Sequence, residues 1–560
     1  MRRRLGTTLL ALLGVLLFAG LAACSGIPRS GAVKPGDALG TDDDIDVIFL
    51  AADPVKGASQ QDILNGFILA AKSPQDDYQI ARRYLTKAAA DSWKPNESAI
   101  VDTGPRPTTA LSDTQLEMNV TPEARVDSNG AYTESTSSAP LPLDFSFTQV
   151  DGEWRINSLE DGIVIEDLFF DQVFSSHALY FYDPTFTYLV PDLRWFPSSV
   201  AVGTRVVKAL LAGPSTWLGD GAVVTAFPDG TTTTAVVTTG GQTQVELSNN
   251  ILQSDANDLE RMQYQLRTSL SDLASASNVT ISVDQNIVPI PGSNIAAPDS
   301  DPRVNAQPLV LRDGAFGYVA GSSVAAIPGI SEGVEGLQPL SAAYSATADT
   351  AAVKASNGQV FAVRAGDAPA VLDQRSGLID PAVDPFGYVW AVPSGAPTSV
   401  TVYGPDDSGV TIPTNWDGAS AITSLEISRD GTRALAFLSV NGLPKLVVAA
   451  VIRDQAGVPQ RLGQPVELST GQGVPVDATW VDQLTVASVT ALPSGEDRAV
   501  AQVLGGRSSS LGAPVGAVSI AGGNDLDGLR VLSSDGGLQQ QRGSAWQATT
   551  TGISRLAVQN

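Results

Sequence analysis

One cysteine, Cys24, and one histidine, His177, occur among the 560 residues, so the chemistry open to this chain is narrow. Tetrahedral metal sites and Cys–His dyads need several such side chains together, so we expect neither a bound metal nor a thiol nucleophile. Gly-rich pieces such as 521–524 open no helix behind a strand, so we expect no cofactor that binds through a phosphate loop. Only acidic or Ser/Thr catalysis remains as an option.

His177 stands beside Ser175 and Ser176 at the start of a predicted strand. A Ser–His dyad needs both side chains within hydrogen-bond reach and an acid that orients the imidazole. Neighbouring residues on a strand point to opposite faces. We therefore expect a structural role for His177.

Carboxylates are plentiful, with 59 Asp and Glu against 34 Lys and Arg. Any adjacent pair, such as Asp406 and Asp407, could be nominated as the acid and base of a glycosidase. Because such pairs are so common here, a pair of carboxylates does not by itself indicate a glycosidase. The acidic runs 42–46 and 524–528 lack the distal carboxylate of a calcium loop and predict a tether and a turn. The formal charge of −25 and the lack of a basic patch exclude nucleic acid as an expected partner.

The N-terminal residues predict the cellular location of the protein. Three arginines at 2–4 precede an apolar stretch, 5–20, that is too short to span a bilayer comfortably and is typical of a signal peptide. The stretch ends in Leu21, Ala22, Ala23 and Cys24, which resembles the bacterial lipobox. The resemblance implies cleavage after residue 23, a diacylglycerol on the Cys24 thiol and an acyl group on its new amino terminus.

Lipidation at Cys24 predicts a lipid-anchored protein on the extracytoplasmic face of the cell membrane. Two or three acyl chains anchor stably, at about 0.8 kcal/mol per buried CH₂, whereas one chain anchors only marginally. No second apolar run of about 18 residues follows, so we expect the rest of the chain to be an ectodomain. Residues 1–23 are the predicted signal peptide, and the Gly/Pro/Ser-rich and acidic segment 24–45 is a predicted flexible tether.

Residues 46–170 predict an α+β domain. Ser59 to Asp62 resembles a capping box, and apolar residues then follow at helical spacing up to Ser73-Pro74. A second helix is expected from about Asp76 to Trp93. Phe145 to Ile156 alternates in polarity around Asp151-Gly152, which predicts a hairpin. Helices followed by strands indicate a helix-on-curved-sheet fold like that of nuclear transport factor two.

Residues 175–290 predict a second α+β domain, with strands at 178–182, 188–191 and 244–248 and helices at 199–211 and 255–273. Three segments carry a resemblance: Leu210 to Pro214, the turn Phe227 to Thr231, and the strand Val245 to Ser248. They are similar to the GerMN domain, an α+β module of bacterial envelope and sporulation proteins, which brings no catalytic residues with it.

After a Pro-rich linker, 291–308, short apolar segments recur between Gly/Asp turns over 309–560. The clearest unit is 424–437, two strands joined at Asp430-Gly431. A spacing of about 40 to 50 residues is typical of propeller blades, and the length allows five or six. A two-sheet sandwich is the alternative.

Seven of the eight tryptophans follow Trp93 and are spread over these modules, and we expect most of them in cores: Trp154, Trp195, Trp217, Trp390, Trp416, Trp480 and Trp546. Aromatic residues crowd around Trp195 in the segment 193–197. Because exposed aromatics are frequent interaction hot spots, Trp195 is the best candidate for an interdomain or partner contact.

Taken together, the lipobox with the following 24–31 segment, the α+β domain ending in 151–156, the GerMN-like segment and the terminal propeller resemble the actinobacterial LpqB lipoprotein family. The resemblance implies a non-enzymatic accessory protein beside an MtrA–MtrB-type two-component system. Its implied partner is the ectodomain of the MtrB-like sensor histidine kinase, and its implied effect is on envelope homeostasis and division. The alternatives are a cell-wall glycan-binding protein, marked by Trp and Tyr around a groove, and an envelope glycosidase with two carboxyls about 5 to 10 Å apart in the propeller.

Overall fold

The computed structural model describes residues 52–135, 138–198, 201–239, 241–273, 278–292 and 295–560. They belong to one compact unit, Phe49–Asn560. The predicted signal peptide, the lipobox, Cys24 and the tether lie outside the described residues. Within the described part of the chain, no helix has the length and apolar character that crossing a membrane requires.

Helices open the first module. Ser59 caps α2 (Gln60–Ala70) because its Oγ accepts the Asp62 N–H while the Asp62 carboxylate accepts the Ser59 N–H, 3.1 Å away. This reciprocal pair is the capping box that the sequence predicts.

The second predicted helix, from 76 to 93, is wrong as a single element. The chain forms three short helices instead: η1 (Gln75–Asp77), α3 (Gln79–Arg82) and α4 (Lys87–Ser92). Asp76, Asp77 and Tyr78 all have positive φ angles, which a right-handed helix does not accommodate. Thr86 then caps α4 by accepting the Ala89 N–H.

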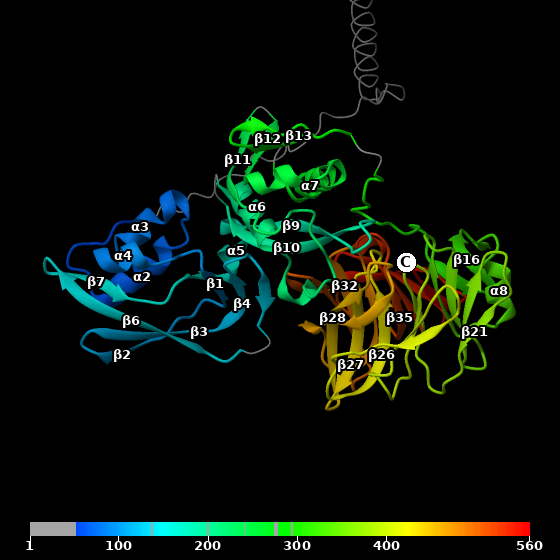
Figure 1. Cartoon of the computed structure of the whole chain (residues 1–560). Coiled ribbons are helices and arrows are strands. Elements are labelled where there is room, and N and C mark those ends of the chain that lie inside the picture. The colour runs from blue at the N-terminus through cyan, green and yellow to red at the C-terminus, as the bar shows by residue number, and fades with distance from the viewer. Residues whose placement is uncertain (1–51, 136–137, 199–200, 240, 274–277, 293–294) are drawn as a thin grey trace, which may run out of the picture. The chain divides into compact units, whose positions relative to one another are not determined.

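Two four-stranded sheets complete the first module, with the orders β5-β4-β1-β8 and β2-β3-β6-β7. Their strands are β1 (Ser98–Asp102), β2 (Thr108–Ser112), β3 (Gln115–Val120), β4 (Pro122–Asp127), β5 (Tyr132–Glu134), β6 (Leu141–Val150), β7 (Glu153–Ser158) and β8 (Ile163–Glu166). The hairpin predicted around Asp151-Gly152 is β6–β7. Helices α2 and α4 pack against β7 (Figure 1). The helix-on-sheet architecture is therefore present, with the strands divided between two sheets rather than joined in one curved sheet.

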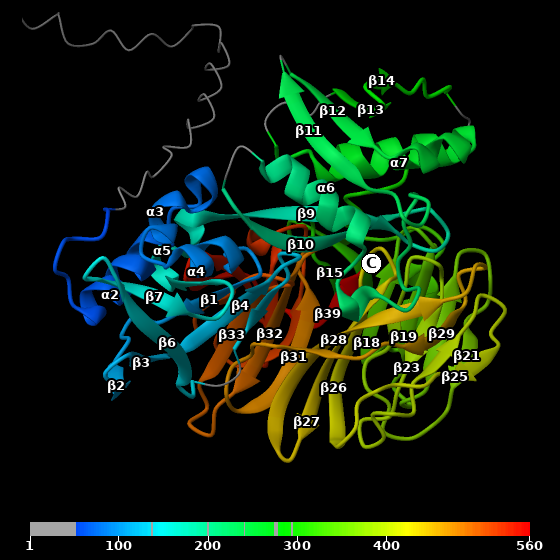
Figure 2. The same ribbon diagram turned by 60° about the vertical axis from the view of Figure 1, so that its left-hand side comes forward.

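The second module places two helices between two β layers. Its elements are α5 (Asp167–Val173), β9 (Phe174–Tyr182), β10 (Leu189–Pro197), α6 (Val202–Ala212), η2 (Thr216–Leu218), β11 (Thr233–Thr239), β12 (Gln242–Leu247), η3 (Asn249–Gln253), α7 (Ala256–Ser269), β13 (Asn278–Val283) and β14 (Asn286–Ile287). Helices α6 and α7 lie between the β9–β10 hairpin and the sheet β11-β12-β13-β14 (Figure 2). Fully buried Leu210, Met262 and Leu266 stabilise this arrangement by about 1.5–3 kcal/mol each.

The third module consists of strands arranged as six consecutive blades. Five blades have four strands each, and the blade formed by residues 419–468 has five. Its elements are β15 (Leu309–Arg312), β16 (Ala315–Ala320), β17 (Ser323–Ala325), α8 (Ser331–Gly336), β18 (Ser341–Ser345), β19 (Thr350–Lys354), β20 (Val360–Arg364), β21 (Ala370–Asp373), β22 (Ala382–Val383), β23 (Val389–Ala391), β24 (Thr401–Tyr403), β25 (Gly409–Thr411), β26 (Ala419–Ile427), β27 (Arg433–Val440), β28 (Leu443–Arg453), β29 (Pro459–Leu462), β30 (Val466–Leu468), β31 (Val474–Trp480), β32 (Thr485–Ala491), β33 (Asp497–Val503), β34 (Ser508–Ser510), β35 (Ala517–Ala521), η4 (Leu526–Gly528), β36 (Arg530–Ser533), β37 (Leu538–Arg542), β38 (Ala545–Thr550) and β39 (Ile553–Gln559).

The ring closes through β39. This strand pairs antiparallel with β15 and thereby completes the first blade, and its last residues pair parallel with β18 of the second blade. The inner strands β18, β22, β26, β31, β35 and β39 contact one another in sequence around the ring. The predicted propeller is confirmed with six blades, and the two-sheet sandwich is excluded.

The linker before the propeller is bonded on both sides. The Asp299 backbone exchanges hydrogen bonds with Leu189 and Thr187, at 2.8 and 2.9 Å, beside the start of β10. The Asn524 side chain in the last blade accepts the Val304 N–H and donates to the Val304 carbonyl, both at 2.9 Å. The linker therefore connects the second module to the propeller by specific contacts.

Candidate functional site

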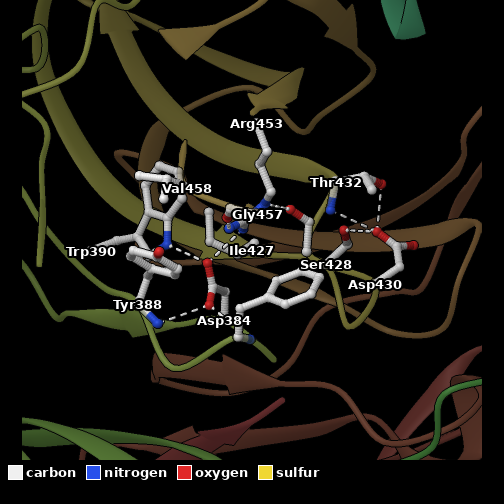
Figure 3. A network of polar contacts seen from close by, with 12 residues as sticks. Asp384, Tyr388, Trp390, Ile427, Ser428, Asp430, Thr432, Arg453, Gly457 and Val458 are labelled. Atoms are coloured by element: carbon white, nitrogen blue, oxygen red, sulfur yellow. Dashed lines mark hydrogen bonds and ion pairs between the residues drawn. The ribbon is translucent and has the colours of Figure 1, made fainter. Parts of the chain in front are cut away.

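Buried charges are the first candidates for chemistry in the propeller. Asp384 and Arg453 form an ion pair of 2.6 Å, with side chains 0% and 1% exposed (Figure 3). The Asp384 carboxylate also accepts the N–H groups of Tyr388 and Trp390. The Arg453 guanidinium donates to the carbonyls of Gly431 and Gly457, both at 2.9 Å. Arg453 thus joins a turn of the third blade to two turns of the fourth.

Asp430 holds the turn between β26 and β27 in the same way. Its carboxylate accepts hydrogen bonds from the Ser428 hydroxyl and from the N–H and hydroxyl of Thr432, and it pairs with the Arg433 guanidinium (Figure 3 draws the Ser428 and Thr432 contacts). Burial alone would raise the pKa of Asp430, but Arg433 and these hydrogen bonds outweigh burial and hold the pKa below its usual value. Asp384 and Asp430 are occupied by protein donors, so this network fixes the blades and offers no free general base.

Two further carboxyls lie on inner strands. Glu426 on β26 accepts the Trp480 N–H at 3.0 Å, and Asp477 on β31 accepts the Ile520 N–H at 2.9 Å. Burial raises the pKa of Glu426 to about 8, with the nearby Asp477 adding to the effect, and burial raises the pKa of Asp477 to about 7. A raised pKa is one mark of a glycosidase acid. Each of these carboxyls, however, ties its blade to the backbone of the next one, which gives it a structural task.

His177 differs in one detail from the expectation. Its Nε2 lies 3.0 Å from the Ser175 Oγ, because residues two apart on β9 share a face; the opposite-face argument holds only for Ser176. The Nδ1 atom is buried without a hydrogen-bond partner among the described residues, and burial lowers the pKa of the imidazole. Without an acid at Nδ1 the pair lacks the third member of a triad.

One cavity has a volume of about 1370 Å³, and all three modules line it. We call it the junction cleft. Its walls are 97–98, 125–129 and 131–135 of the first module, 191–194 and 212–217 of the second, and 442–444, 448, 466–474, 484, 492–493, 502 and 504–506 of the propeller. Small-molecule sites usually occupy about 300–1,000 Å³, so the junction cleft exceeds what a small ligand needs.

The charges of the junction cleft are mainly acidic. The charged residues that line it are Glu97, Arg125, Asp127, Glu134, Asp192, Arg194 and Glu467. Arg194 is neutralised by Asp192, 2.7 Å away, with both side chains buried. Glu467 pairs with Lys445, which lies outside the cleft, at 2.9 Å. Glu97, Asp127 and Glu134 therefore outnumber Arg125, for which no ion pair is found in the described part of the chain, and a positively charged ligand is favoured there.

Direct contacts hold the walls of the cleft together. Glu134 accepts the Ser508 N–H at 2.7 Å and the Ser469 hydroxyl at 2.5 Å, which joins the first module to the propeller. Arg507 of the propeller pairs with Asp167 on α5. The cleft is thus a feature of the bonded three-module unit.

Trp195 lies where the three modules meet. Its indole N–H donates to the Gly505 carbonyl of the propeller at 2.8 Å, and its backbone N–H donates to the Gly130 carbonyl of the first module at 2.7 Å. Its ring packs against Tyr132 and Phe170, at centroid distances of 5.8 and 5.0 Å. The structure therefore places Trp195 in an intramolecular contact between modules, while its contact with a partner stays a prediction.

The sequence did not indicate that three residues of the junction cleft belong to a candidate site. Trp217, expected in a core, is half-buried and packs against both the core of the second module and the propeller. Leu443 and Val474 on its rim are 68% and 64% exposed. No sequence pattern distinguishes Leu443 and Val474, because the exposure of the first residue of a strand depends on its neighbours in space. Of the remaining tryptophans, Trp390, Trp416 and Trp480 are buried, as expected.

The predicted anchor residue, Cys24, with Leu21, Ala22 and Ala23, lies outside the described residues and is not placed. Among the described residues, no cluster of three or more His, Cys, Asp and Glu side chains is arranged to hold a metal ion.

Comparison with protein-family models gives three matches. Residues 53–171 match the N-terminal domain of lipoprotein LpqB, residues 178–288 match the model described as sporulation and spore germination, and residues 314–556 match the LpqB beta-propeller domain. The GerMN-like and propeller predictions are confirmed.

Curated relatives carry the same family name. Lipoprotein LpqB of Nocardia farcinica is 28% identical over 545 residues, which cover 85% of this chain and 84% of the relative. Lipoprotein LpqB of Cutibacterium acnes is 31% identical over 277 residues, 48% of this chain, and the chain spans about half of that relative, 46%. Among solved structures, the first GerMN domain of the Bacillus subtilis sporulation protein GerM is 21% identical, with 22% of this chain and 97% of that chain covered and a TM-score of 0.19.

Proposed function

The chain belongs to the LpqB lipoprotein family, and on that premise we propose that it is a membrane-anchored accessory protein of a two-component system. Its lipid anchor is Cys24, on the extracytoplasmic face of the cell membrane. Its partner is the ectodomain of an MtrB-like sensor histidine kinase, and its effect on kinase output influences envelope homeostasis and division. The proposal assigns no catalytic step and no cofactor to the chain.

The observation that carries the proposal is the junction cleft, a cavity of about 1370 Å³ walled by three modules that hydrogen bonds and an ion pair hold together. A bonded surface of this size suits binding of a macromolecule. We also keep the domain boundaries 46–170, 175–290 and 309–560 as part of the proposal.

Anchoring at the membrane allows weak contacts with the kinase to be sufficient for binding. A protein held at the membrane shares a thin layer with sensor ectodomains, which raises its effective concentration. Binding then shifts the kinase between conformations by the difference in affinity for the two states. Stronger binding to one kinase conformation is therefore the property that the proposal requires.

Direct binding tests the proposal. The mature chain, residues 24–560 without the lipid, is titrated against the purified kinase ectodomain by interferometry at physiological salt, with an unrelated kinase ectodomain as the control. We expect saturable binding to the MtrB-like ectodomain alone. Lack of binding to it, or equal binding to both, overturns the proposal.

A further inference from the structure

The junction cleft is lined by both exposed apolar residues and acidic residues. Leu443 begins β28 in the fourth blade and Val474 begins β31 in the fifth, and both side chains are strongly exposed. Trp217 of the second module adds a half-buried indole to the same cavity. Exposed apolar side chains gathered at a large cavity mark interaction sites, and aromatic residues in such cavities frequently dominate the binding energy.

The charges indicate the sign of the ligand. Glu97 is exposed, and Asp127 uses its Oδ1 to accept the N–H groups of Asn129 and Ala131. Glu134 accepts hydrogen bonds from two neutral donors, the Ser508 N–H and the Ser469 hydroxyl. The formal charge of the whole chain, −25, has the same sign. Cations are therefore attracted to the junction cleft and anions are repelled.

The size of the cleft and the spread of its walls indicate an extended ligand. The cleft is lined by β5, the edge strand of its sheet, and by 442–444 and 466–474 of the propeller. Its volume exceeds that of typical small-molecule sites, and an extended peptide of about eight residues, at roughly 3.3 Å per residue, has the reach to contact several walls.

We propose that the junction cleft binds an extended peptide segment of a partner protein, in which lysine or arginine side chains alternate with apolar ones. The apolar side chains contact Leu443, Val474 and Trp217, and the cations lie near Glu97, Asp127 and Glu134. This inference deepens the proposed function, since the segment belongs to the sensor ectodomain if that proposal holds.

Variants of exposed residues test the apolar contacts without disturbing a core. In the mature chain, Leu443→Asp and Val474→Asp are compared with Val515→Asp and Val410→Asp, which lie outside the cleft and are 75% and 59% exposed. We expect the two cleft variants to weaken binding of the kinase ectodomain by about tenfold or more, and the two controls to leave it unchanged. Equal effects of cleft and control variants overturn the inference while the proposed function stands.

Charge is tested with two synthetic peptides of eight residues, one alternating lysine and leucine and the other alternating glutamate and leucine. Fluorescence anisotropy with the mature chain should detect binding of the lysine peptide only, and salt should weaken it. Glu97→Lys should reduce this binding, whereas Asp417→Lys, outside the cleft, should not. If the kinase ectodomain does not bind but the lysine peptide does, the proposed function fails and the inference stands; if neither binds, or the glutamate peptide binds equally, the inference is overturned.

Discussion

Single side chains connect the modules at the residue scale. Trp195 reaches both the propeller and the first module from its position on β10, and Trp217 contacts the propeller from η2. The crowding of aromatics around Trp195 was sufficient to predict a contact between domains. Trp217 has no such neighbours in sequence, so only the folded arrangement reveals it.

Trp195→Ala should weaken the junction by about 2–4 kcal/mol, because a half-buried indole and its hydrogen bond to Gly505 are both lost. Several modules do not unfold as one two-state system, so the midpoint of the first urea transition is the quantity to compare. Trp195→Phe keeps an aromatic ring and loses only the donor, and it should cost about 1 kcal/mol. Equal costs for the two variants would show that packing of the ring contributes nothing.

Arg453→Met should destabilise the propeller by about 3–5 kcal/mol, since Asp384 would remain buried as an uncompensated charge. Adding Asp384→Asn removes that charge while an amide oxygen can still accept N–H groups. The double variant should therefore be more stable than Arg453→Met alone in urea unfolding followed by circular dichroism. A double variant that is less stable than both single variants contradicts this account.

Local patterns predicted most elements at the scale of helices and strands. The capping box at Ser59, the turn at Asp151-Gly152 and the turn at Asp430-Gly431 are found where expected, because each depends on residues close in sequence. The helix expected from 76 to 93 starts late because Asp76, Asp77 and Tyr78 have positive φ angles, and it is interrupted between α3 and α4, where Leu85 forms a bridge with Ile156. The pairing of β39 with β15 depends on contacts between segments that are distant in sequence. The spacing of apolar residues along the chain does not predict such contacts.

Protonated carboxyls between blades give the propeller a predictable pH dependence. Glu426 has a folded pKa of about 8, above its ordinary value of 4.5, so the unfolded chain releases this proton at lower pH than the folded chain does. The contribution of Glu426 to the free energy of unfolding is therefore greatest near and below pH 4.5. At higher pH this contribution falls by about 1.4 kcal/mol per pH unit until the pH reaches the folded pKa.

Glu426→Gln should flatten this dependence, because the amide carries no titrating proton and its oxygen can still accept the Trp480 N–H. Thermal unfolding of the mature chain from pH 5 to pH 9 measures the difference. Asp417→Asn, at an exposed position, serves as the control. Identical pH profiles for the wild type and Glu426→Gln would refute the assignment of the proton to Glu426.

The junction cleft belongs to the scale of the whole molecule. Its walls come from segments several hundred residues apart, such as Glu134 and Ser469. The propeller and GerMN-like folds could be predicted from sequence, and the lipobox predicts the anchor, but a cavity between modules has no local signature. The sequence indicated only a contact at Trp195, which is not among the residues that line the cleft.

Cys24→Ala should release the protein from the membrane, because the proposed acyl chains attach there. Fractionation of cells should find the variant in the soluble envelope or medium fraction. Its affinity for the kinase ectodomain in solution should equal that of the wild type, while its effect on kinase output in cells should fall. Normal signalling by the released variant would show that confinement at the membrane is not required.

The position of β39 also constrains how the protein is made. The first blade remains one strand short until this segment has been synthesised, although the rest of that blade precedes it by most of the propeller. Until then the ring stays open, with the β15 edge unpaired and prone to join strands of other chains. Chaperones and proteases that meet the growing chain therefore encounter an incomplete propeller, and a premature stop codon just before β39 would yield an aggregation-prone product rather than a slightly shorter folded protein.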